Sequence, residues 1–385
     1  MIDTVELFAG TGGLALGLQE AGFSHTALVE RDRHSCDNLE SNAAYVAAKD
    51  GIGWNVEQAD VRTIDFSPYE GLVRVVAGGP PCQPFSLGGK GKAYDDSRDM
   101  FPEAVRAVRE IKPEAFIFEN VKGLLRKSFS TYFNYIILQL TYPEIVRPAA
   151  GTWQDHLALL ERQHTSTGGM ALKYNVAFRV LNAADYGIPQ MRHRVFIVGF
   201  RSDINAQWAF PEGMYSQNAL LYDQWVTGRY WDAHSMERPD CPFSQKQLDD
   251  IKAKNADLFA GKRPWRTVRD ALRGLPEPYM EDGTPQNHRY HGAAKVYPGH
   301  TGSVMDMPSK TIKAGAHGVP GGENMLVLDS GAMRYYTVRE SARIQTFPDG
   351  YVFRSSWTES MRQIGNAVPV DLARQVGQSV ALQLQ

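Results

Sequence analysis

The stretch TVELFAGTGG at residues 4–13 decides the fold. Its apolar start is typical of a buried strand, and its glycines then turn the chain sharply. A helix follows directly, because Leu14 and Leu18 stand four residues apart on one face. This order of strand, turn and helix predicts the first unit of an open α/β sheet, with the turn at the carboxyl edge where such sheets bind ligands.

Strand and helix signals continue to alternate along the chain. A helix is expected after Asp32, which suits an N-cap, and another over 101–111. Two later apolar runs, at 175–181 and 194–198, are joined by a short link that favours a hairpin. The remaining strands are expected at 26–29, near Asp60, at 72–76 and at 115–118. This rhythm predicts an α/β fold with a doubly wound, mostly parallel, Rossmann-like sheet.

The pattern changes along the chain and predicts three segments. Residues 1–200 form a first domain, within which 124–173 reads as an insertion with some helix and no assigned role. Residues 201–352 are richer in glycine, proline, histidine and aromatic residues, which predicts a smaller, loop-rich β domain. Residues 353–385 regain helical spacing and are expected to return to the first domain.

Composition narrows the class of protein without deciding its function. The 385 residues are 43% hydrophobic and 22% charged, as expected of a globular chain with a real core. Three widely spaced cysteines favour a reducing compartment, and no leader or membrane-length apolar run is visible, so a cytoplasmic protein is expected. A net charge of -2 allows a local phosphate-binding face but no basic coat.

The first group of candidate site residues suits an adenosyl cofactor. The turn from Phe8 to Gly13 brings backbone close to a ligand at a helix N-terminus. Glu30 ends the next expected strand, where an acid binds ribose hydroxyls, and Asp60 is placed to accept from an adenine amino group. Ordinary turn glycines with surface acids, or a nicotinamide site, are the alternatives. The Gly-x-Gly-Gly spacing lacks a clean dinucleotide fingerprint and favours S-adenosylmethionine.

The second group suits attack on a pyrimidine ring. Cys82 lies in GGPPCQPFS at 78–86, where three prolines stiffen a loop that follows an expected strand. A thiolate adding at carbon 6 of cytosine makes carbon 5 nucleophilic. Glu119 is placed to bind ring nitrogen 3, while Arg192 and Arg194 are placed to bind the exocyclic oxygen and lower the thiol pKa. The alternatives are a small buried cysteine, a solvated glutamate and an exposed arginine face.

Together these residues resemble the DNA cytosine-5 methyltransferase family, of the bacterial restriction-modification type. The resemblance runs almost from end to end, in the family's order. Beside the glycine turn and the two acids, it rests on PCQ at 81–83, DSR at 96–98, ENV at 119–121, DYGIPQMRHR at 185–194, RESARIQTFP at 339–348 and QIGNAVP at 363–369. One departure is the spacing between Asn120 and Asp185, which is longer than in compact members of the family.

The resemblance implies a reaction and a set of residues for it. Cys82 would add to carbon 6 of a flipped cytosine in duplex DNA, Glu119 would bind nitrogen 3, and Arg194 with Arg192 would steady the ring and the glutamate. S-adenosylmethionine would be converted to S-adenosylhomocysteine without a metal. The implied cofactor-binding residues are Phe8, Gly10, Thr11, Gly12, Gly13, Glu30, Arg31, Asp60, Val61, Pro80, Asn366 and Val368.

The resemblance also implies two DNA-facing surfaces. One is the loop GGKGK at 88–92, expected to close over DNA, and the other is the small target-recognition domain with basic residues between 262 and 273. The expected DNA-binding residues are Gln83, Ser86, Lys90, Lys92, Arg98, Arg266, Lys313 and His317. A monomer is expected, with a restriction endonuclease acting on the same DNA site without a stable complex, and with no membrane partner.

Three alternatives remain open from the sequence. A methyltransferase of the same chemistry acting on transfer RNA is disfavoured by the sizeable region between Arg201 and Tyr336, which suits a DNA reader. A DNA-binding protein with an inactive catalytic domain is disfavoured because every catalytic residue type is present. A nicotinamide oxidoreductase would require binding of a dinucleotide.

Overall fold

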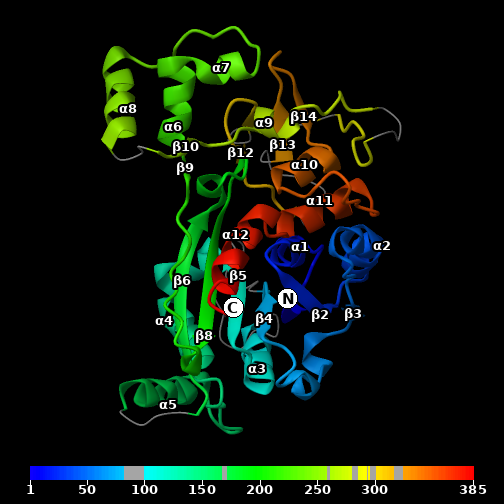
Figure 1. Cartoon of the computed structure of the whole chain (residues 1–385), viewed down its shortest axis with the longest axis vertical. Coiled ribbons are helices and arrows are strands. Elements are labelled where there is room, and N and C mark those ends of the chain that lie inside the picture. Colours follow the sequence, from blue (N-terminus) through cyan, green and yellow to red (C-terminus); the bar gives the residue numbers. More distant parts are fainter. Residues whose placement is uncertain are drawn as a thin grey trace. The chain divides into compact units, whose positions relative to one another are not determined.

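The structure, a computed structural model, describes residues 1–81, 99–166, 171–257, 261–279, 285–292, 294, 301–315 and 324–385. The chain forms two compact units, which are coloured along the sequence in Figure 1. Both chain ends lie in unit 1. Unit 1 comprises Met1–Leu181, His193–Phe210 and Ala373–Gln385, and unit 2 comprises Asn182–Arg192 and Pro211–Leu372.

A seven-stranded sheet forms the framework of unit 1, in the order β3-β2-β1-β4-β5-β8-β6. Neighbouring strands from β3 to β5 run parallel, and β8 pairs with β5 in the antiparallel sense. The strands are β1 (Ile2–Leu7), β2 (Phe23–Glu30), β3 (Val56–Gln58), β4 (Val75–Gly78), β5 (Ala115–Val121), β6 (Tyr174–Asn182) and β8 (His193–Arg201). The expected mostly parallel α/β sheet is therefore confirmed, and β6 and β8 are neighbours, as a hairpin requires.

The strand order changes direction between β1 and β4. From β1 the chain proceeds outward to β2 and β3, and it then returns to the other side of β1 for β4 and β5. Leu7 pairs with both Val29 and Gly78, so the carboxyl ends of three strands lie level. Open parallel sheets bind their ligands at such a switch point, because the two diverging turns leave room between them.

Helices connect the strands and cover the sheet. Asp32 caps α2 by accepting a hydrogen bond from the Ser35 N–H at 2.9 Å, as its sequence position predicts. The 124–173 region does contain helices, namely α4 and α5. The helices are α1 (Gly13–Glu20), α2 (Arg33–Asp50), α3 (Phe101–Ile111), α4 (Ser130–Thr141), α5 (Trp153–Thr165) and α12 (Val370–Ala381), with short 3-10 turns η1 (Val61–Thr63), η2 (Ser67–Tyr69), η4 (Lys122–Leu125), η5 (Lys127–Phe129) and η7 (Ser202–Ile204).

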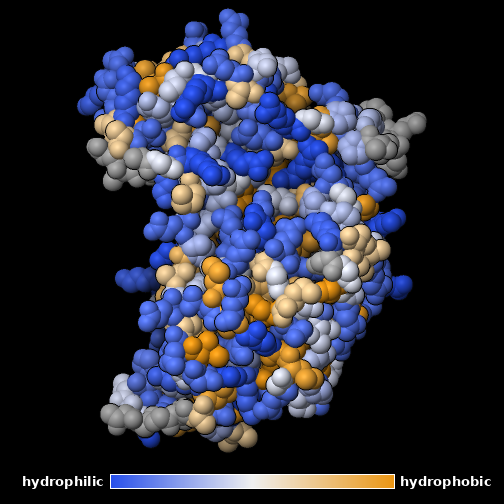
Figure 2. All heavy atoms as spheres, viewed as in Figure 1, coloured by the Kyte–Doolittle hydropathy of each residue, from blue (hydrophilic) through white to orange (hydrophobic). Residues whose placement is uncertain are grey.

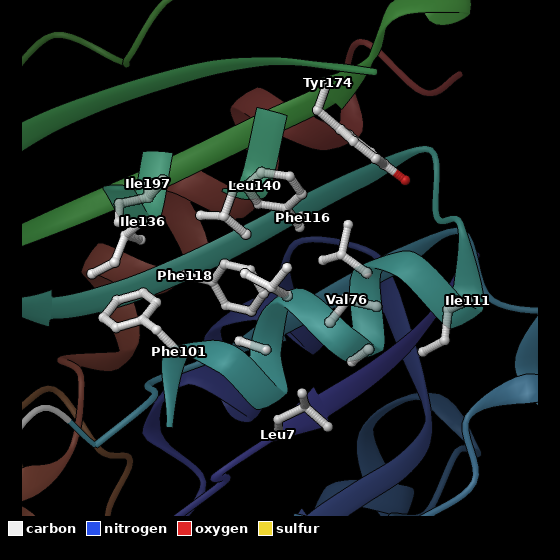
Figure 3. Close-up of a cluster of buried hydrophobic side chains, with 14 of the residues drawn as sticks. Leu7, Val76, Phe101, Ile111, Phe116, Phe118, Ile136, Leu140, Tyr174 and Ile197 are labelled. Carbon is white, nitrogen blue, oxygen red and sulfur yellow. The ribbon is translucent and has the colours of Figure 1, made fainter. Parts of the chain in front are cut away.

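The hydrophobic core of unit 1 joins α3 and α4 to the sheet. Phe116 and Phe118 stand two residues apart on β5 and therefore point to the same face, with ring centroids 5.2 Å apart. Figure 3 shows them among side chains from β1, β4, α3, α4 and β8. Tyr174 contributes its ring to this cluster and donates its hydroxyl to the Pro113 carbonyl at 2.7 Å, so its one polar group is satisfied.

Unit 2 is built from short strands and short helices. Its strands are two or three residues long, and most of the regular structure described there is helical, which the expectation of a loop-rich β domain did not include. The elements are β7 (Gln190–Met191), β9 (Tyr215–Ser216), β10 (Arg263–Pro264), β11 (Ser303–Val304), β12 (Ser309–Lys310), β13 (Met325–Val327), β14 (Met333–Tyr335), α6 (Gln217–Tyr222), α7 (Arg229–Ala233), α8 (Gln245–Asp257), α9 (Val268–Leu272), α10 (Val338–Ile344) and α11 (Trp357–Asn366), with the turns η6 (Ala183–Tyr186) and η8 (Asp223–Thr227).

The two units are interleaved along the chain, and the points where the chain passes between them differ from the expected boundaries at 200 and 352. Residues 182–192 belong to unit 2, although they lie within the expected first domain. Only 373–385 of the C-terminal segment belong to unit 1. There the Arg74 guanidinium donates to the Leu384 carbonyl at 2.6 Å, which ties the chain end to the strand region of unit 1.

Hydrophilic residues dominate the face drawn in Figure 2, with hydrophobic residues in small groups. Single exposed apolar side chains are normal on protein surfaces. Among the described residues, no helix is both long enough and apolar enough to cross a membrane.

A glycine on β8 is expected to be required for packing of the core. A Cβ at Gly199 would lie 2.2 Å from the Phe116 ring, so Gly199→Ala should lower the free energy of unfolding by about 1–3 kcal/mol through overpacking. Urea denaturation measures the change. Gly53→Ala is the control, because its Cβ would meet nothing nearer than 3.9 Å. Equal midpoints for the two variants would contradict this description of the core.

Candidate active site

The glycine turn after β1 adopts an unusual backbone conformation. Phe8, Gly10 and Gly12 all have positive φ angles, of 57°, 54° and 79°. For Phe8 this conformation is costly, and such strain persists where surrounding structure enforces it, often at ligand sites. A Cβ at Gly12 would lie 2.7 Å from the Leu39 side chain, so packing as well as φ requires glycine there.

The Glu30 carboxylate is held at the carboxyl end of β2. It accepts hydrogen bonds from the N–H groups of Gly10 at 2.8 Å, Arg31 at 2.8 Å and Asp32 at 2.7 Å. These donors come from two turns, so Glu30 ties the glycine turn after β1 to the start of α2. A carboxylate has about four acceptor positions, so three backbone bonds leave capacity for a ligand hydroxyl.

Asp60 lies just beyond β3 and is surrounded by positive charge. It accepts from the Arg62 N–H at 3.1 Å and Nε at 2.9 Å, and its second oxygen meets Arg62 Nη2 at 2.5 Å and Arg31 Nη1 at 3.5 Å. The Arg62 hydrogen bonds hold the pKa of the Asp60 carboxyl well below its usual range. Asp60 therefore remains an ionised acceptor at neutral pH.

The other predicted cofactor residues divide between the two units. Gly13 begins α1, Val61 begins η1, and Pro80 is buried just after β4, all in unit 1. The buried Thr11 hydroxyl accepts from Asn38 Nδ2 at 2.6 Å, so it already has a partner within the protein. In unit 2, Asn366 is the exposed last residue of α11, and Val368 is buried.

Glu119 and Arg194 form an ion pair across two strands of unit 1. The Arg194 Nε lies 2.8 Å from Glu119 Oε1, and the two side chains are only 13% and 9% exposed. The antiparallel register pairs Arg194 with Val121, two residues beyond the glutamate. Burial lowers the pKa of Arg194, and the Glu119 carboxylate opposes that shift. The structure thus brings together two of the predicted catalytic residues at the carboxyl end of β5.

Arg192 has a different environment from Arg194. Its side chain is fully buried in unit 2, where Nη1 donates to the Ile312 carbonyl at 3.1 Å. Nη2 donates to the carbonyls of Gly365 at 2.8 Å and Ala367 at 2.9 Å. The boundary between the units falls just after Arg192. The structure therefore gives Arg192 a bracing role inside unit 2, and its direct contact with the pyrimidine ring stays a prediction.

Several predicted residues lie outside the described residues. The structure describes the chain as far as Pro80 and Pro81, directly before Cys82, and again from Asp99 onward. A Cβ at Gly79 would lie 3.6 Å from Glu119 Oε2, so the chain that leads to Cys82 passes beside Glu119. The residues outside the description are Cys82, Gln83, Ser86, Lys90, Lys92, Arg98 and His317.

The expected basic cluster between 262 and 273 is largely used within unit 2. Arg269 pairs with Asp306 at 2.6 Å and with Asp329 at 2.5 Å, which neutralises its charge. Lys262 donates to the Gly213 carbonyl at 2.6 Å. Trp265 belongs to a buried aromatic cluster. The sequence could not reveal these contacts, because the acidic partners are distant in the chain.

Two predicted DNA-binding residues of unit 2, Arg266 and Lys313, are exposed. Buried Asn324 holds the backbone at Lys313 from both sides, since its Oδ1 accepts from the Lys313 N–H and its Nδ2 donates to the Lys313 carbonyl, each at 2.9 Å. The position of this backbone is therefore fixed beneath an exposed lysine. Contact of these two side chains with DNA stays a prediction.

Three further cationic residues were missed by the sequence reading. Lys122, Arg126 and Lys127 are exposed, and they follow Glu119 in the chain. Lys122 begins η4, Lys127 begins η5, and Arg126 joins the two turns. The signal was present in the string KGLLRK at 122–127, where three positive charges stand directly beyond the glutamate motif. We name these three residues the basic ridge.

Among the described residues, no group of three or more His, Cys, Asp and Glu side chains is arranged to hold a metal ion. The site described so far consists of a strained glycine turn, two fixed carboxylates and a buried Glu–Arg pair.

This arrangement of residues agrees with the protein family whose model matches the chain. A family model described as C-5 cytosine-specific DNA methylase matches residues 2–142 and 168–381. The chain belongs to this family. It is a C-5 cytosine DNA methyltransferase of the type II restriction-modification kind, and its family uses a methyl donor of the S-adenosylmethionine type.

Two relatives illustrate the extent of the similarity. The chain is 34% identical over 383 residues to the type II methyltransferase M.Eco47II of Escherichia coli, covering 98% of this chain and 78% of that protein. It is 31% identical over 382 residues to M.NgoMIV of Neisseria gonorrhoeae, covering 98% and 96%.

Solved structures share the fold. A putative DNA modification methyltransferase encoded within a prophage of E. coli aligns with a TM-score of 0.58 at 20% identity, covering 100% of this chain and 99% of that one. A mutant of Spodoptera frugiperda DNMT2 aligns with a TM-score of 0.58 at 14% identity, covering 100% of both chains. At these identities the likeness concerns the fold alone.

Removing the Arg192 guanidinium should destabilise unit 2. Arg192→Met keeps most of the side-chain volume but removes a donor from three buried carbonyls, of which, among the described residues, only that of Ala367 keeps another bond, from Gln345 Nε2 at 3.2 Å. The free energy of unfolding should therefore fall by about 3 kcal/mol or more. Chemical denaturation measures the change. Arg266→Gln, at an exposed arginine of the same unit, should change stability by less than about 0.5 kcal/mol. Similar losses in both variants would contradict the bracing role.

Proposed function

We propose that this enzyme methylates carbon 5 of cytosine within a short specific sequence of double-stranded DNA, by covalent addition of Cys82 to a flipped base. The observation that carries the proposal is the buried ion pair of Glu119 and Arg194 beside the end of β4, from which the chain leads to Cys82. That arrangement supplies an oriented carboxyl group where a thiolate mechanism requires one for ring nitrogen 3.

The residues at the carboxyl ends of β1, β2 and β3 fit an adenosyl cofactor. The turn from Phe8 to Gly13 brings backbone to the switch point of the sheet, and the spare acceptor capacity of Glu30 suits ribose hydroxyls. The ionised Asp60 suits the amino group of adenine. When bound, S-adenosylmethionine supplies the methyl group as an electrophile and leaves as S-adenosylhomocysteine.

The proposed roles in the reaction follow from these positions. The Cys82 thiolate forms a bond to carbon 6 of cytosine, and the electrons of the 5,6 double bond shift toward carbon 5, which takes the methyl group. The Glu119 carboxyl group, in its protonated form, donates its hydrogen to nitrogen 3 and so neutralises the negative charge that develops there, while Arg194 holds the carboxyl group in place. Loss of the carbon 5 proton then restores the double bond and releases Cys82.

Base flipping is part of the proposal because carbon 6 is covered in a stacked duplex. The basic ridge supports a DNA contact beside the pocket. It starts one residue beyond Val121, which pairs with Arg194 in the ladder, and η4 lies against β8 and α4. Exposed cations at this place suit the phosphates that flank the flipped nucleotide.

The proposed partners and location follow from the substrate. The enzyme would act as a monomer on duplex DNA in the cytoplasm. A restriction endonuclease would share its recognition sequence without forming a stable complex.

Bisulfite sequencing of DNA from cells expressing this chain tests the function, beside cells expressing Cys82→Ala. Methylcytosine confined to one short motif is expected for the wild type, and none above background for the variant, because no other group is proposed to add to carbon 6. DNA with 5-fluorocytosine at the target should trap the wild type in a denaturation-resistant adduct. Full activity of Cys82→Ala would overturn the covalent mechanism.

Loss of the basic ridge should weaken DNA binding in a salt-dependent way. With Lys122, Arg126 and Lys127 all changed to Gln, the slope of log affinity against log salt should become shallower by about 2–3, because each phosphate contact contributes about 0.9. Binding is measured by fluorescence anisotropy with a labelled duplex. The single variant Arg126→Gln is compared with the control Arg162→Gln, which changes an exposed arginine on α5 of the same unit. Identical slopes for this pair and the wild type would exclude the ridge from DNA binding.

A further inference from the structure

We infer that Asn120 and Tyr132 are positioning residues that hold both ends of the chain segment carrying Cys82. The inference rests on the proposed function of Cys82 and deepens it. Three described hydrogen bonds carry it, and together we name them the clasp: Asn120 with Pro80, Met100 with Pro81, and Tyr132 with Asp99.

The first bond holds the chain as it leaves β4. Asn120 Nδ2 donates to the Pro80 carbonyl at 2.8 Å, and the Asn120 side chain is almost completely buried. Its Oδ1 accepts from the Val121 N–H at 2.8 Å, which fixes the orientation of the amide. The donor is therefore aimed at Pro80, two residues before Cys82, from the position next to Glu119.

A side chain is needed here because the backbone ladder cannot continue. The pairing of β4 with β5 ends at Gly78 and Phe118. Pro80 and Pro81 have no N–H and cannot donate to a neighbouring strand. The Pro80 carbonyl would lie buried without a donor, and Asn120 supplies one from the extension of β5 beyond the ladder.

The other two bonds hold the chain where it enters α3. The Met100 N–H donates to the Pro81 carbonyl at 3.2 Å, so the two flanks of 82–98 meet directly. The Tyr132 hydroxyl donates to Asp99 Oδ2, while Asp99 Oδ1 accepts from the Phe101 N–H at 3.2 Å at the start of α3. Tyr132 comes from α4, so the clasp gives a role to the region 124–173.

The clasp links the position of Cys82 to that of Glu119. Asn120 is the chain neighbour of Glu119, and its amide determines where Pro80 lies. A reacting atom displaced by about 1 Å loses about 100-fold in rate, so this tether should affect the chemical step more than cofactor binding.

The test compares four variants of the full-length enzyme. Asn120→Ala and Tyr132→Phe remove a clasp donor each. Tyr135→Phe is the matched control for the tyrosine, because on the same helix it loses a buried hydroxyl bond to His156 Nδ1 of 2.8 Å. Asn287→Ala is the control for the asparagine, because it likewise loses an amide that donates to a carbonyl, that of Phe353 at 2.8 Å, and accepts from an N–H, that of Phe353 at 2.9 Å, in unit 2.

Both clasp variants should show kcat and the rate of adduct formation on 5-fluorocytosine DNA lowered by about tenfold or more, with the Kd for S-adenosylmethionine within about twofold of wild type. Both controls should retain the wild-type rates. Equal adduct rates in Asn120→Ala and Asn287→Ala, or equal rates in Tyr132→Phe and Tyr135→Phe, would overturn the inference.

Hydrogen exchange at the Met100 amide provides a readout that does not depend on catalysis. Its exchange should be faster in the clasp variants than in the controls, because its acceptor Pro81 is no longer held. Unchanged exchange would overturn the clasp even if activity fell. Absence of any wild-type adduct would instead refute the proposed function, while faster exchange would still support the clasp.

Discussion

The antiparallel pairing of β5 with β8 is the constraint on which the catalytic end of the sheet depends. Six of the seven ladder positions from Ala115 to Val121 are formed by buried residues of β5, so the register is strongly determined by the core. That register places Arg194 beside Glu119, where a slip of one residue would turn the arginine to the other face. A buried carboxylate is stable only with such a partner, because unpaired burial of its charge is costly.

At the end of β4, the regular hydrogen bonds of the sheet stop next to the residues that are proposed for the chemistry. Gly78 lies so close to β1 that a Cβ would be 2.4 Å from the Leu7 carbonyl, and the prolines that follow remove two backbone donors. The chain leaves the sheet abruptly as a result. Asn120 and Met100 compensate by supplying donors to the two proline carbonyls. Rigidity beside the proposed nucleophile thus comes from one side-chain amide and one backbone N–H of neighbouring elements.

Unit 2 depends on buried arginines that serve as multiple hydrogen-bond donors. Arg192 binds three carbonyls, and Arg339 binds those of Gln286, Pro348 and Tyr351. Arg334 pairs with Glu340 through two bonds of 2.7 and 2.6 Å. Short strands leave many backbone carbonyls without ladder partners, and the planar guanidinium satisfies several of them at once. The motif segments at 185–194, 339–348 and 363–369, which the sequence suggested for chemistry or recognition, therefore also stabilise this unit.

The sequence by itself determined the framework and the residue types of the site. The α/β alternation, the glycine turn, Asp32 as a helix cap, and the placement of Glu30, Asp60 and Glu119 at strand ends all follow from local patterns, because period, caps and turns act over a few residues. Only the tertiary structure showed that Arg192 and Arg194 have different environments, although the two stand two residues apart. It also showed that the charge of Arg269 is neutralised by partners, and it revealed the donors of the clasp. Those outcomes depend on partners tens of residues away, and a local pattern contains no information about such partners.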